Sequence, residues 1–261
     1  MAGFIDIACN FTHESFKNNL ETVIANAENA GVEKFVLLSA SLKDLDQIQI
    51  IQSKSPEKYF ICSGIHPHHA NEIKDINYKK LLEKLQSTNP NAIGETGLDY
   101  FRNISPPNIQ RDAFRMQIDI AKELKLPLYL HQRDAHDDFI KIIKENIRNF
   151  PKFIVHCFTG TQSQLDQYLE LGAYIGLTGW ICDVKRNIDL RKSIKNIPIE
   201  RMMIETDCPY LIPKNLISET KNNVNEPKYL PHIAQEICEL IGVEIEELKV
   251  VTSKNAVNFF S

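Results

Sequence analysis

Eight short apolar runs recur along the whole chain, and they constrain its fold more than any other feature. They lie at Phe4–Cys9, Lys34–Ser39, Tyr59–Ile65, Ala92–Leu98, Pro127–His131, Lys152–His156, Ala173–Leu177 and Met202–Glu205. Most are continuous rather than alternating, as in strands that are buried on both faces. Helical patterns separate them; in Ile109–Leu124, for example, apolar residues repeat at helical spacing. The sequence therefore predicts a parallel sheet covered by helices.

The spacing of these runs indicates how the sheet is arranged. Their starts are about 20–36 residues apart, which suits strand–helix units. Eight units and a helical C-terminal region, Pro227–Ile241 and Glu244–Phe260, fill the 261 residues. The least regular stretch, Pro209–Asn225, follows the eighth strand. We expect an α/β fold, a TIM-type (β/α)8 barrel with extra C-terminal helices, formed by a single domain over residues 1–261.

Charge and composition exclude several classes of protein. Thirty Lys and Arg residues against thirty-four Asp and Glu residues give a net charge of −4, which excludes a polycationic nucleic-acid coat but not a locally basic cleft. No apolar run approaches the roughly 20 residues that span a bilayer, and no signal peptide is visible. The six cysteines are scattered, without a C-x-x-C pair. We expect a cytoplasmic protein with reduced thiols and no membrane contact.

Polar residues follow almost every predicted strand. In a βα barrel these strand ends meet at one mouth, where active sites are found. In chain order they are Asn10, Thr12, His66, His68, His69, Glu95, Asp99, His131, Arg133, His156, Thr178, Glu205, Thr206 and Asp207.

A single buried histidine is more often structural than functional, but a whole rim of polar residues is hard to explain by stability. Unpaired carboxylates and imidazoles cost several kcal/mol to desolvate, and a divalent cation offsets that cost. Glu95, His131, His156 and Asp207 form a suitable mixed set of oxygen and nitrogen ligands. The set is too rich in nitrogen for Ca²⁺ but compatible with Zn²⁺, Mn²⁺ or hydrated Mg²⁺.

At these residues the sequence resembles the TatD family of metal-dependent deoxyribonucleases, within the amidohydrolase-like barrel superfamily. The resemblance covers essentially the whole chain, in order and with family-like spacing. The matching stretches are residues 4–7 (FIDI), 10–12 (NFT), 64–68 (GIHPH), 92–99 (AIGETGLD), 130–135 (LHQRDA), 156–160 (HCFTG), 174–180 (YIGLTGW), 204–210 (IETDCPY) and 225–227 (NEP).

The resemblance implies a divalent-metal hydrolase, most simply a 3′→5′ exonuclease on single-stranded DNA or RNA. It implies that Glu95 is a metal ligand that can bridge two ions, with His131 and His156 as imidazole ligands. Asp207 would hold metal or accept the proton of the attacking water, and His66 would approach the scissile phosphate. It implies one or two ions, with Mg²⁺ first and Mn²⁺ or Zn²⁺ as alternatives. We expect a monomer without an obligate protein partner.

The sequence departs from many relatives at the end of strand one. An H-x-H pair there supplies two further ligands, whereas this chain has Asn10-Phe11-Thr12. The TatD-proper branch shares this feature, which places the chain in that branch and argues against a fully occupied two-metal site. Asn10 would hold a water, contribute a weak ligand oxygen or contact substrate. His13 lies nearby but beyond the strand, so it is a poor ligand candidate.

Basic and aromatic residues near the predicted mouth are candidates for substrate contacts. Arg133 and Arg102 suit bidentate phosphate binding, with Lys185-Arg186 as a weaker candidate. Each of these cations is equally consistent with a salt bridge or a solvated position on the rim. Four rings could stack on unpaired bases or simply cap the barrel: Tyr100, Phe101, Trp180 and Tyr210.

Three further residues of the strands are structural candidates. Strand alternation places Cys157 and Cys208 opposite their neighbouring ligands, so we expect both to pack beneath the helices. Asp6, inside strand one, is either a buried partner for an imidazole or a residue of the barrel floor.

Two other functions compete with the nuclease. A metal-dependent amidohydrolase or deaminase acting on a small C–N substrate usually has the strand-one H-x-H and often a carbamylated lysine; here Glu95 occupies the bridging position. A non-catalytic barrel that binds nucleic acid or protein is the third possibility, and the four intact candidate ligands argue against it.

Overall fold

The computed structural model of the chain describes residues 3–149, 152–219 and 223–261. All eight strands of the described chain run parallel in one sheet, in the order β1 to β8. Residues 1–2 of the N-terminus and residues 220–222 of the irregular stretch lie outside the described residues. The strands are β1 Phe4–Cys9, β2 Val32–Leu38, β3 Tyr59–Ser63, β4 Ala92–Asp99, β5 Leu128–Arg133, β6 Phe153–Val155, β7 Tyr174–Leu177 and β8 Met202–Ile204.

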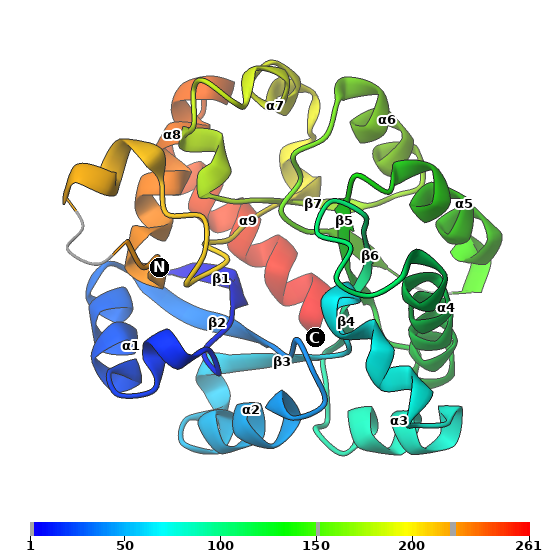
Figure 1. The fold of residues 1–261 in the computed structure, drawn as a ribbon. Coiled ribbons are helices and arrows are strands. Elements are labelled where there is room, and N and C mark those ends of the chain that lie inside the picture. Colours follow the sequence, from blue (N-terminus) through cyan, green and yellow to red (C-terminus); the bar gives the residue numbers. More distant parts are fainter. Residues whose placement is uncertain (1–2, 150–151, 220–222) are drawn as a thin grey trace.

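A helix follows each strand and packs on the outside of the ring, as Figure 1 shows along the barrel axis. The predicted TIM-type barrel with extra C-terminal helices is therefore confirmed. The α-helices are α1 Leu20–Asn29, α2 Asp44–Ser53, α3 Tyr78–Gln86, α4 Pro107–Leu124, α5 His136–Asn146, α6 Gln162–Glu170, α7 Ile188–Ser193, α8 Leu230–Ile241 and α9 Ile245–Phe260.

The first and last strands close the barrel through a short contact. Cys9 and Cys208 form an isolated parallel bridge, and Asn10 N donates to the carbonyl oxygen of Cys208 at 3.0 Å. This seam brings the end of β1 against the segment that follows β8. Residues that are about 200 positions apart in the sequence thus become neighbours at the mouth.

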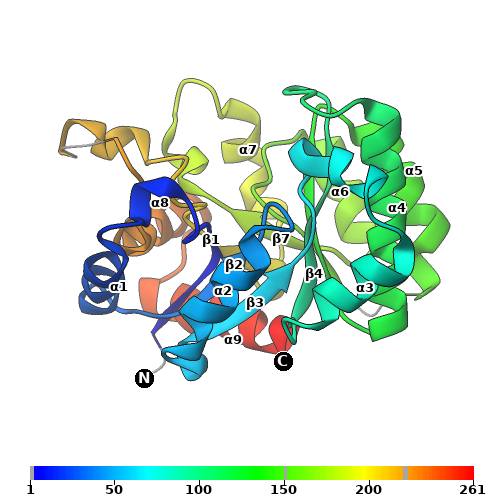
Figure 2. The ribbon, with the colours of Figure 1, turned by 60° about the horizontal axis from the view of Figure 1, so that its bottom comes forward.

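Two hydrophobic cores explain why the strands are apolar on both sides. The larger core lies between the strands and the surrounding helices, and includes Phe35, Phe114 and Phe139. The smaller core fills the barrel with inward residues such as Ile7 and Val36, and it also contains Phe259 and Phe260 of α9. Figure 2 shows α9, in red, lying at the end of the barrel that also carries the N-terminus. The last helix thus closes one end of the barrel, and the site lies at the opposite end.

Helix α4 fixes the position of the site strands through two buried glutamines. Gln117 accepts a hydrogen bond from Ile65 N at 2.7 Å and donates to Thr96 Oγ1 at 2.7 Å. Gln110 accepts from Asp99 N at 2.8 Å and donates to the Asp99 carbonyl oxygen at 3.1 Å. Because both amides satisfy backbone groups at the ends of β3 and β4, they fix the positions of these two strand ends at the mouth.

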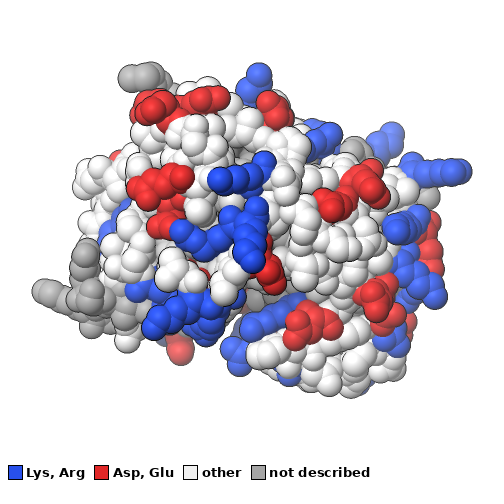
Figure 3. All heavy atoms as spheres, turned by 90° about the horizontal axis from the view of Figure 1, so that it is seen from above, with Lys and Arg blue, Asp and Glu red and all other residues white. Residues whose placement is uncertain are grey.

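The surface carries both signs of charge. In the view of Figure 3, Lys and Arg side chains gather near the middle of one face, with Asp and Glu side chains beside them. None of the helices in the described part of the chain has the length and hydropathy needed to cross a membrane.

Candidate metal centre

One carboxylate oxygen lies at the centre of a cluster of three imidazoles at the mouth of the barrel. Glu95 Oε1, on β4, is 2.7 Å from His156 Nε2, 2.9 Å from His131 Nδ1 and 3.3 Å from His66 Nε2. The ring nitrogens of His131 and His156 are themselves 3.3 Å apart. Four of the five catalytic or metal residues predicted from the sequence therefore converge on one point.

Glycines on the neighbouring strands make room for this cluster. At Gly97, whose φ is +141°, a Cβ would lie 2.0 Å from the carbonyl oxygen of His131. At Gly176 a Cβ would lie 2.7 Å from Glu205 Oε1 and 3.0 Å from His156 Cα. A side chain at either position would displace a strand that carries a cluster residue.

Each of two imidazoles has a buried carboxylate on its far side. His131 Nε2 lies 3.4 Å from Asp99 Oδ2, and His156 Nδ1 lies 3.5 Å from Glu205 Oε2. Glu205 is fully buried and is held by Tyr129 Oη, which donates to Oε2 at 2.7 Å, and by Cys157 N, which donates to Oε1 at 2.5 Å. Carboxylates in this position fix the tautomer and orientation of ligating histidines.

The buried charges shift one another's protonation. Burial alone would raise the pKa of Glu95, but the adjacent imidazoles of His156 and His66 hold it well below its usual range. Burial opposes the charged form of His156, yet Glu95 and Glu205 raise its pKa well above the usual value. For His66 burial outweighs the effect of the nearby Glu95 carboxylate and lowers the pKa to about 4. His66 is thus neutral at pH 7.

Hydrogen bonds distinguish His66 from the other two imidazoles. His66 Nδ1 accepts from the backbone N–H of His68 at 3.1 Å, so in this neutral ring the proton sits on Nε2. His68 Nε2 lies 2.7 Å from Asp99 Oδ2. A ring with its proton on Nε2 can donate a hydrogen bond at the mouth, whereas His131 and His156 would offer a lone pair there once a bound cation displaced the proton that Glu95 attracts.

Asp207 lies beside the cluster rather than within it. Asn10 Nδ2 donates to Asp207 Oδ1 at 3.2 Å and to the carbonyl oxygen of Cys208 at 3.1 Å. Asp207 has a φ of +56°, uncommon for a residue with a side chain. Burial raises the pKa of Asp207 to about 8, with His156 opposing the shift and Glu95 reinforcing it. The strand-one asparagine therefore orients this carboxylate.

The remaining candidates occupy the rim. The guanidinium of Arg133 lies over the Phe101 ring, with Cζ 3.9 Å from the ring centroid. Arg102 contributes its backbone N–H to Asp99 Oδ1 at 2.8 Å, while its side chain is exposed. His13 accepts from Ser15 N at 3.1 Å and lies apart from the cluster.

The seam between β1 and β8 explains Asp6 and two of the cysteines. Asp6 accepts hydrogen bonds from Thr206 N at 2.9 Å and Thr206 Oγ1 at 2.5 Å, so its partner is the β8 end rather than an imidazole. Cys208 belongs to the outer core beneath the helices, as expected. Cys157 is different: it is only partly buried, and its Sγ lies 3.6 Å from Thr178 Oγ1.

The donors at the mouth fit a divalent cation. Glu95 Oε1, His131 Nδ1 and His156 Nε2 each offer one ligand atom, at 2.7 to 3.3 Å from one another. A single oxygen cannot satisfy three imidazoles equally, whereas a cation would accept lone pairs from His131 Nδ1 and His156 Nε2 while the far nitrogens keep their protons toward Asp99 and Glu205. Carboxylate and imidazole donors suit Zn²⁺ and Mn²⁺, and Mg²⁺ when it retains water.

Sequence reasoning assigned no site role to four residues that surround this centre: Asp99, Glu205, His68 and Tyr129. The first three stand at strand ends or in a matching motif, so a signal was present. In the sequence Tyr129 looks like an ordinary apolar strand residue, and only the folded barrel shows that its hydroxyl donates to Glu205.

A barrel of eight parallel strands, with carboxylates and imidazoles gathered where the strands end, defines the class of barrel hydrolases that use divalent metal ions. Within that class, the profile of the TatD related DNases matches residues 5–261. The chain therefore belongs to the TatD family of metal-dependent hydrolases.

Individual relatives agree with this assignment. The "3'-5' ssDNA/RNA exonuclease TatD" of Pectobacterium atrosepticum is 37% identical over 255 residues, which are 98% of this chain and 98% of that protein. A crystal structure of a TatD family hydrolase from Entamoeba histolytica superposes with a TM-score of 0.89 at 29% identity, over 99% of this chain and 98% of that one. A TatD homologue from Escherichia coli K12 gives a TM-score of 0.86 at 25% identity, over 98% and 97% of the two chains. The amidohydrolase alternative is not favoured.

Proposed function

We propose that this chain removes nucleotides from the 3′ end of single-stranded DNA or RNA by metal-dependent hydrolysis of phosphodiester bonds. The observation that carries the proposal is the set of two carboxylate-backed imidazoles, His131 and His156, that face the same oxygen of Glu95. Carboxylate–imidazole–metal arrangements of this kind are typical of catalytic metal sites. The name of the Pectobacterium relative, a 3′-5′ ssDNA/RNA exonuclease, supports the direction and the substrate.

In this proposal Glu95, His131 and His156 hold the metal, and Asp207 takes the other role predicted for it, as proton acceptor. Backing by Asp99 and Glu205 keeps the two rings oriented with a lone pair toward the mouth. A divalent cation bound there would lower the pKa of water from 15.7 toward about 7 and neutralise charge on the phosphate. The family resemblance favours Mg²⁺, while the nitrogen-rich donor set suits Mn²⁺ and Zn²⁺ equally well.

Two side chains act on the reacting groups themselves. Asp207 orients the attacking water and accepts its proton, while Asn10 holds this carboxylate in place by donating to Oδ1. His66 donates a hydrogen bond from its Nε2–H to an oxygen of the scissile phosphate, because its Nδ1 already accepts from the N–H of His68. Arg133, Arg102 and Asn10 were the predicted substrate contacts; of these, Asn10 acts through Asp207.

A digestion assay tests the proposal. Metal-stripped protein is incubated with 5′-labelled and 3′-labelled single-stranded oligonucleotides of DNA and of RNA, and Mg²⁺, Mn²⁺ or Zn²⁺ is added back. We expect the 5′-labelled strand to give a shortening ladder and the 3′-labelled strand to release its label as mononucleotide, in both cases only with metal. Unchanged strands with all three ions would contradict the proposal. The expected monomeric state and cytoplasmic location stay predictions, which light scattering and cell fractionation would check.

A further inference from the structure

A cavity of about 390 Å³ opens beside the metal centre, over the ends of β5, β6 and β7. We call it the arginine–aromatic pocket, after the six residues that define it. They are Phe101, Arg133, Thr159, Gln164, Trp180 and Arg186. Its size lies within the range of roughly 300–1,000 Å³ that small-ligand sites occupy.

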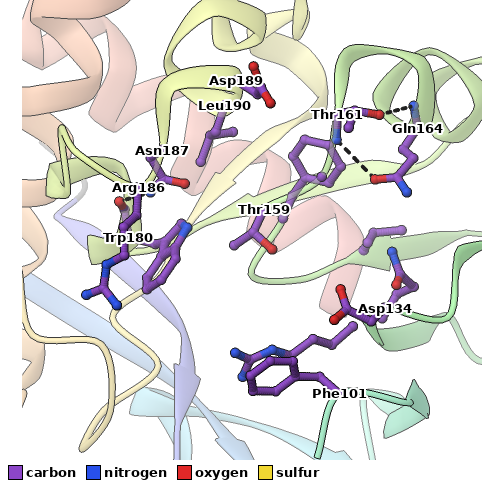
Figure 4. A pocket seen from close by; sticks show the side chains of 15 residues that line it. Phe101, Asp134, Thr159, Thr161, Gln164, Trp180, Arg186, Asn187, Asp189 and Leu190 are labelled. Carbon is purple, nitrogen blue, oxygen red and sulfur yellow. Dashed lines mark hydrogen bonds between the residues drawn. The ribbon is translucent and has the colours of Figure 1, made fainter.

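The pocket adjoins the cluster through the chain itself. Gln132 and Arg133, which line it, directly follow His131, and Val155, which also lines it, directly precedes His156. A strand with its scissile phosphate at the cluster therefore passes the opening of this pocket. Figure 4 shows Phe101 and Trp180 at separate parts of its wall, with Thr159 between them.

Two arginine–aromatic pairs flank the opening. Arg133 Cζ lies 3.9 Å from the centroid of Phe101, and Arg186 Cζ lies 5.0 Å from the centroid of Trp180. Arg186 is held in place by Asp183, which accepts from its Nε at 2.8 Å. Planar guanidinium and aromatic groups are the surfaces on which unpaired bases stack.

The charges in the pocket favour a neutral occupant. Asp134 and Asp189 line it together with Arg133 and Arg186, so two carboxylates stand against two guanidinium groups. A phosphate would meet no net positive charge there.

Exposed apolar side chains concentrate around the same mouth. Of the eight large hydrophobic side chains that are exposed in the described chain, five lie on segments that follow β4, β7 or β8. They are Phe101, Ile104, Val184, Ile188 and Tyr210. Exposed apolar groups gathered on one rim mark a binding surface rather than the ordinary scatter of single residues.

We infer that the arginine–aromatic pocket binds one nucleobase of the substrate strand by stacking, without reading its identity. This inference rests on the proposed function and deepens it, because a base must leave a duplex to enter the pocket. Stacking of this kind accepts any of the bases, since every base has a π-face. The pocket thus selects single strands.

Trp180 reports on the pocket directly, because it is the only tryptophan in the chain. Its fluorescence is titrated in the Mg²⁺-loaded protein with an octathymidylate joined by phosphorothioate links, which hydrolyse slowly. The same titration uses an abasic octamer with identical links and a blunt-ended duplex, and binding of each is followed in parallel by anisotropy. We expect saturable quenching by the octathymidylate, and less than a tenth of that quenching by the abasic strand and the duplex.

A variant pair adds a kinetic readout. Phe101→Ala removes a ring that is 57% exposed, so the fold is retained. Stacking of one base is worth about 1–3 kcal/mol, so we expect KM for a single strand to rise at least about fivefold, with most of the loss in KM rather than kcat. Arg201→Gln is the control. Arg201 also covers a ring, with Cζ 5.0 Å from the Tyr174 centroid, but it directly precedes β8 and so lies at the end of the barrel away from the mouth. It should change neither constant.

The outcomes separate the pocket from the reaction. Equal quenching by the abasic strand or the duplex, or tight binding that leaves Trp180 fluorescence unchanged, would overturn the inference while the nuclease stands. An unaltered KM in Phe101→Ala would do the same. If no strand binds and none is cleaved with any metal, the proposed function itself is wrong, and the pocket has no strand to receive.

Discussion

Replacing Glu95 with glutamine tests the metal centre at the side chain that contacts all three imidazoles. Glu95 Oε1 lies within 3.3 Å of three ring nitrogens, and the side chain is only 7% exposed. Glutamine keeps the shape and one acceptor oxygen but removes the negative charge. The neutral amide is a weak metal ligand, and it cannot bridge imidazole donors as a carboxylate does. We therefore expect metal binding to fail while the barrel persists.

The size of the effect follows from linkage. A metal present at 100 times its Kd stabilises the native state by about 2.7 kcal/mol, which for a chain of this size raises Tm by about 5–10 °C. Losing a residue that merely orients a ligand already weakens metal binding by about 10–100-fold, and a direct ligand should cost at least the upper value. At the same metal concentration the metal then stabilises the native state of the variant by only about 0.4 kcal/mol, which raises its Tm by about 1 °C.

Differential scanning calorimetry of metal-free and Mn²⁺-loaded protein measures both shifts. Each protein is compared with its own metal-free form, so any change that the substitution makes to the bare fold cancels. Glu57→Gln serves as the control, since Glu57 is exposed in the 3₁₀ helix Pro56–Lys58, and its Mn²⁺ shift should equal that of the wild type. A Glu95→Gln protein that keeps the full wild-type shift would refute the assignment of this centre.

Three further predictions concern the surroundings of the site. Phe259→Ala opens the buried end of the barrel and should lower the unfolding free energy by about 3–5 kcal/mol, measured in urea; a loss below about 1 kcal/mol would show that α9 does not close the barrel. Tyr129→Phe leaves Glu205 without its 2.7 Å donor, so Mn²⁺ affinity should fall about 10–100-fold by calorimetry; unchanged affinity would mean that Glu205 does not act through His156. Burial raises the pKa of Cys9 and of Cys208, so the thiolate forms are scarce and iodoacetamide at pH 8 should label neither in the folded protein, as read by peptide mass; rapid labelling of either would contradict their burial.

The barrel could be predicted from the sequence because both faces of its strands are buried, which makes each strand a continuous apolar run. A continuous apolar run such as Phe4–Cys9 has no other simple interpretation once seven similar runs follow it, and the structure gives β1 these same bounds. The ends of β6 were less clear: Lys152–His156 was predicted, and Phe153–Val155 is the strand. His156 N still donates to the carbonyl oxygen of Leu130 on β5 at 3.0 Å, so the chain keeps one bond to the sheet just beyond the end of β6.

The closing role of α9 could not be predicted in the same way. The periodicity of Glu244–Phe260 indicates a helix, but it does not say which end of the barrel the helix covers. That depends on Phe259 and Phe260 reaching the inward faces of strands far away in the sequence. The backing of His156 by Glu205 is a similar case, because the pair forms only when β6 and the end of β8 are brought together across β7.

The absent strand-one histidines gain a physical meaning from the seam of the barrel. Asn10 follows β1, and its amide spans to Asp207 and to the carbonyl oxygen of Cys208, both beyond β8. The position where many relatives carry a ligand is therefore used here to orient a carboxylate. Under the proposed function β4, β5 and the end of β6 supply the metal ligands Glu95, His131 and His156, and the β1–β8 seam supplies the proton acceptor. An Asn10→Ala protein should accordingly bind Mn²⁺ as the wild type does and lose turnover, whereas a parallel loss of Mn²⁺ affinity would place Asn10 among the ligands.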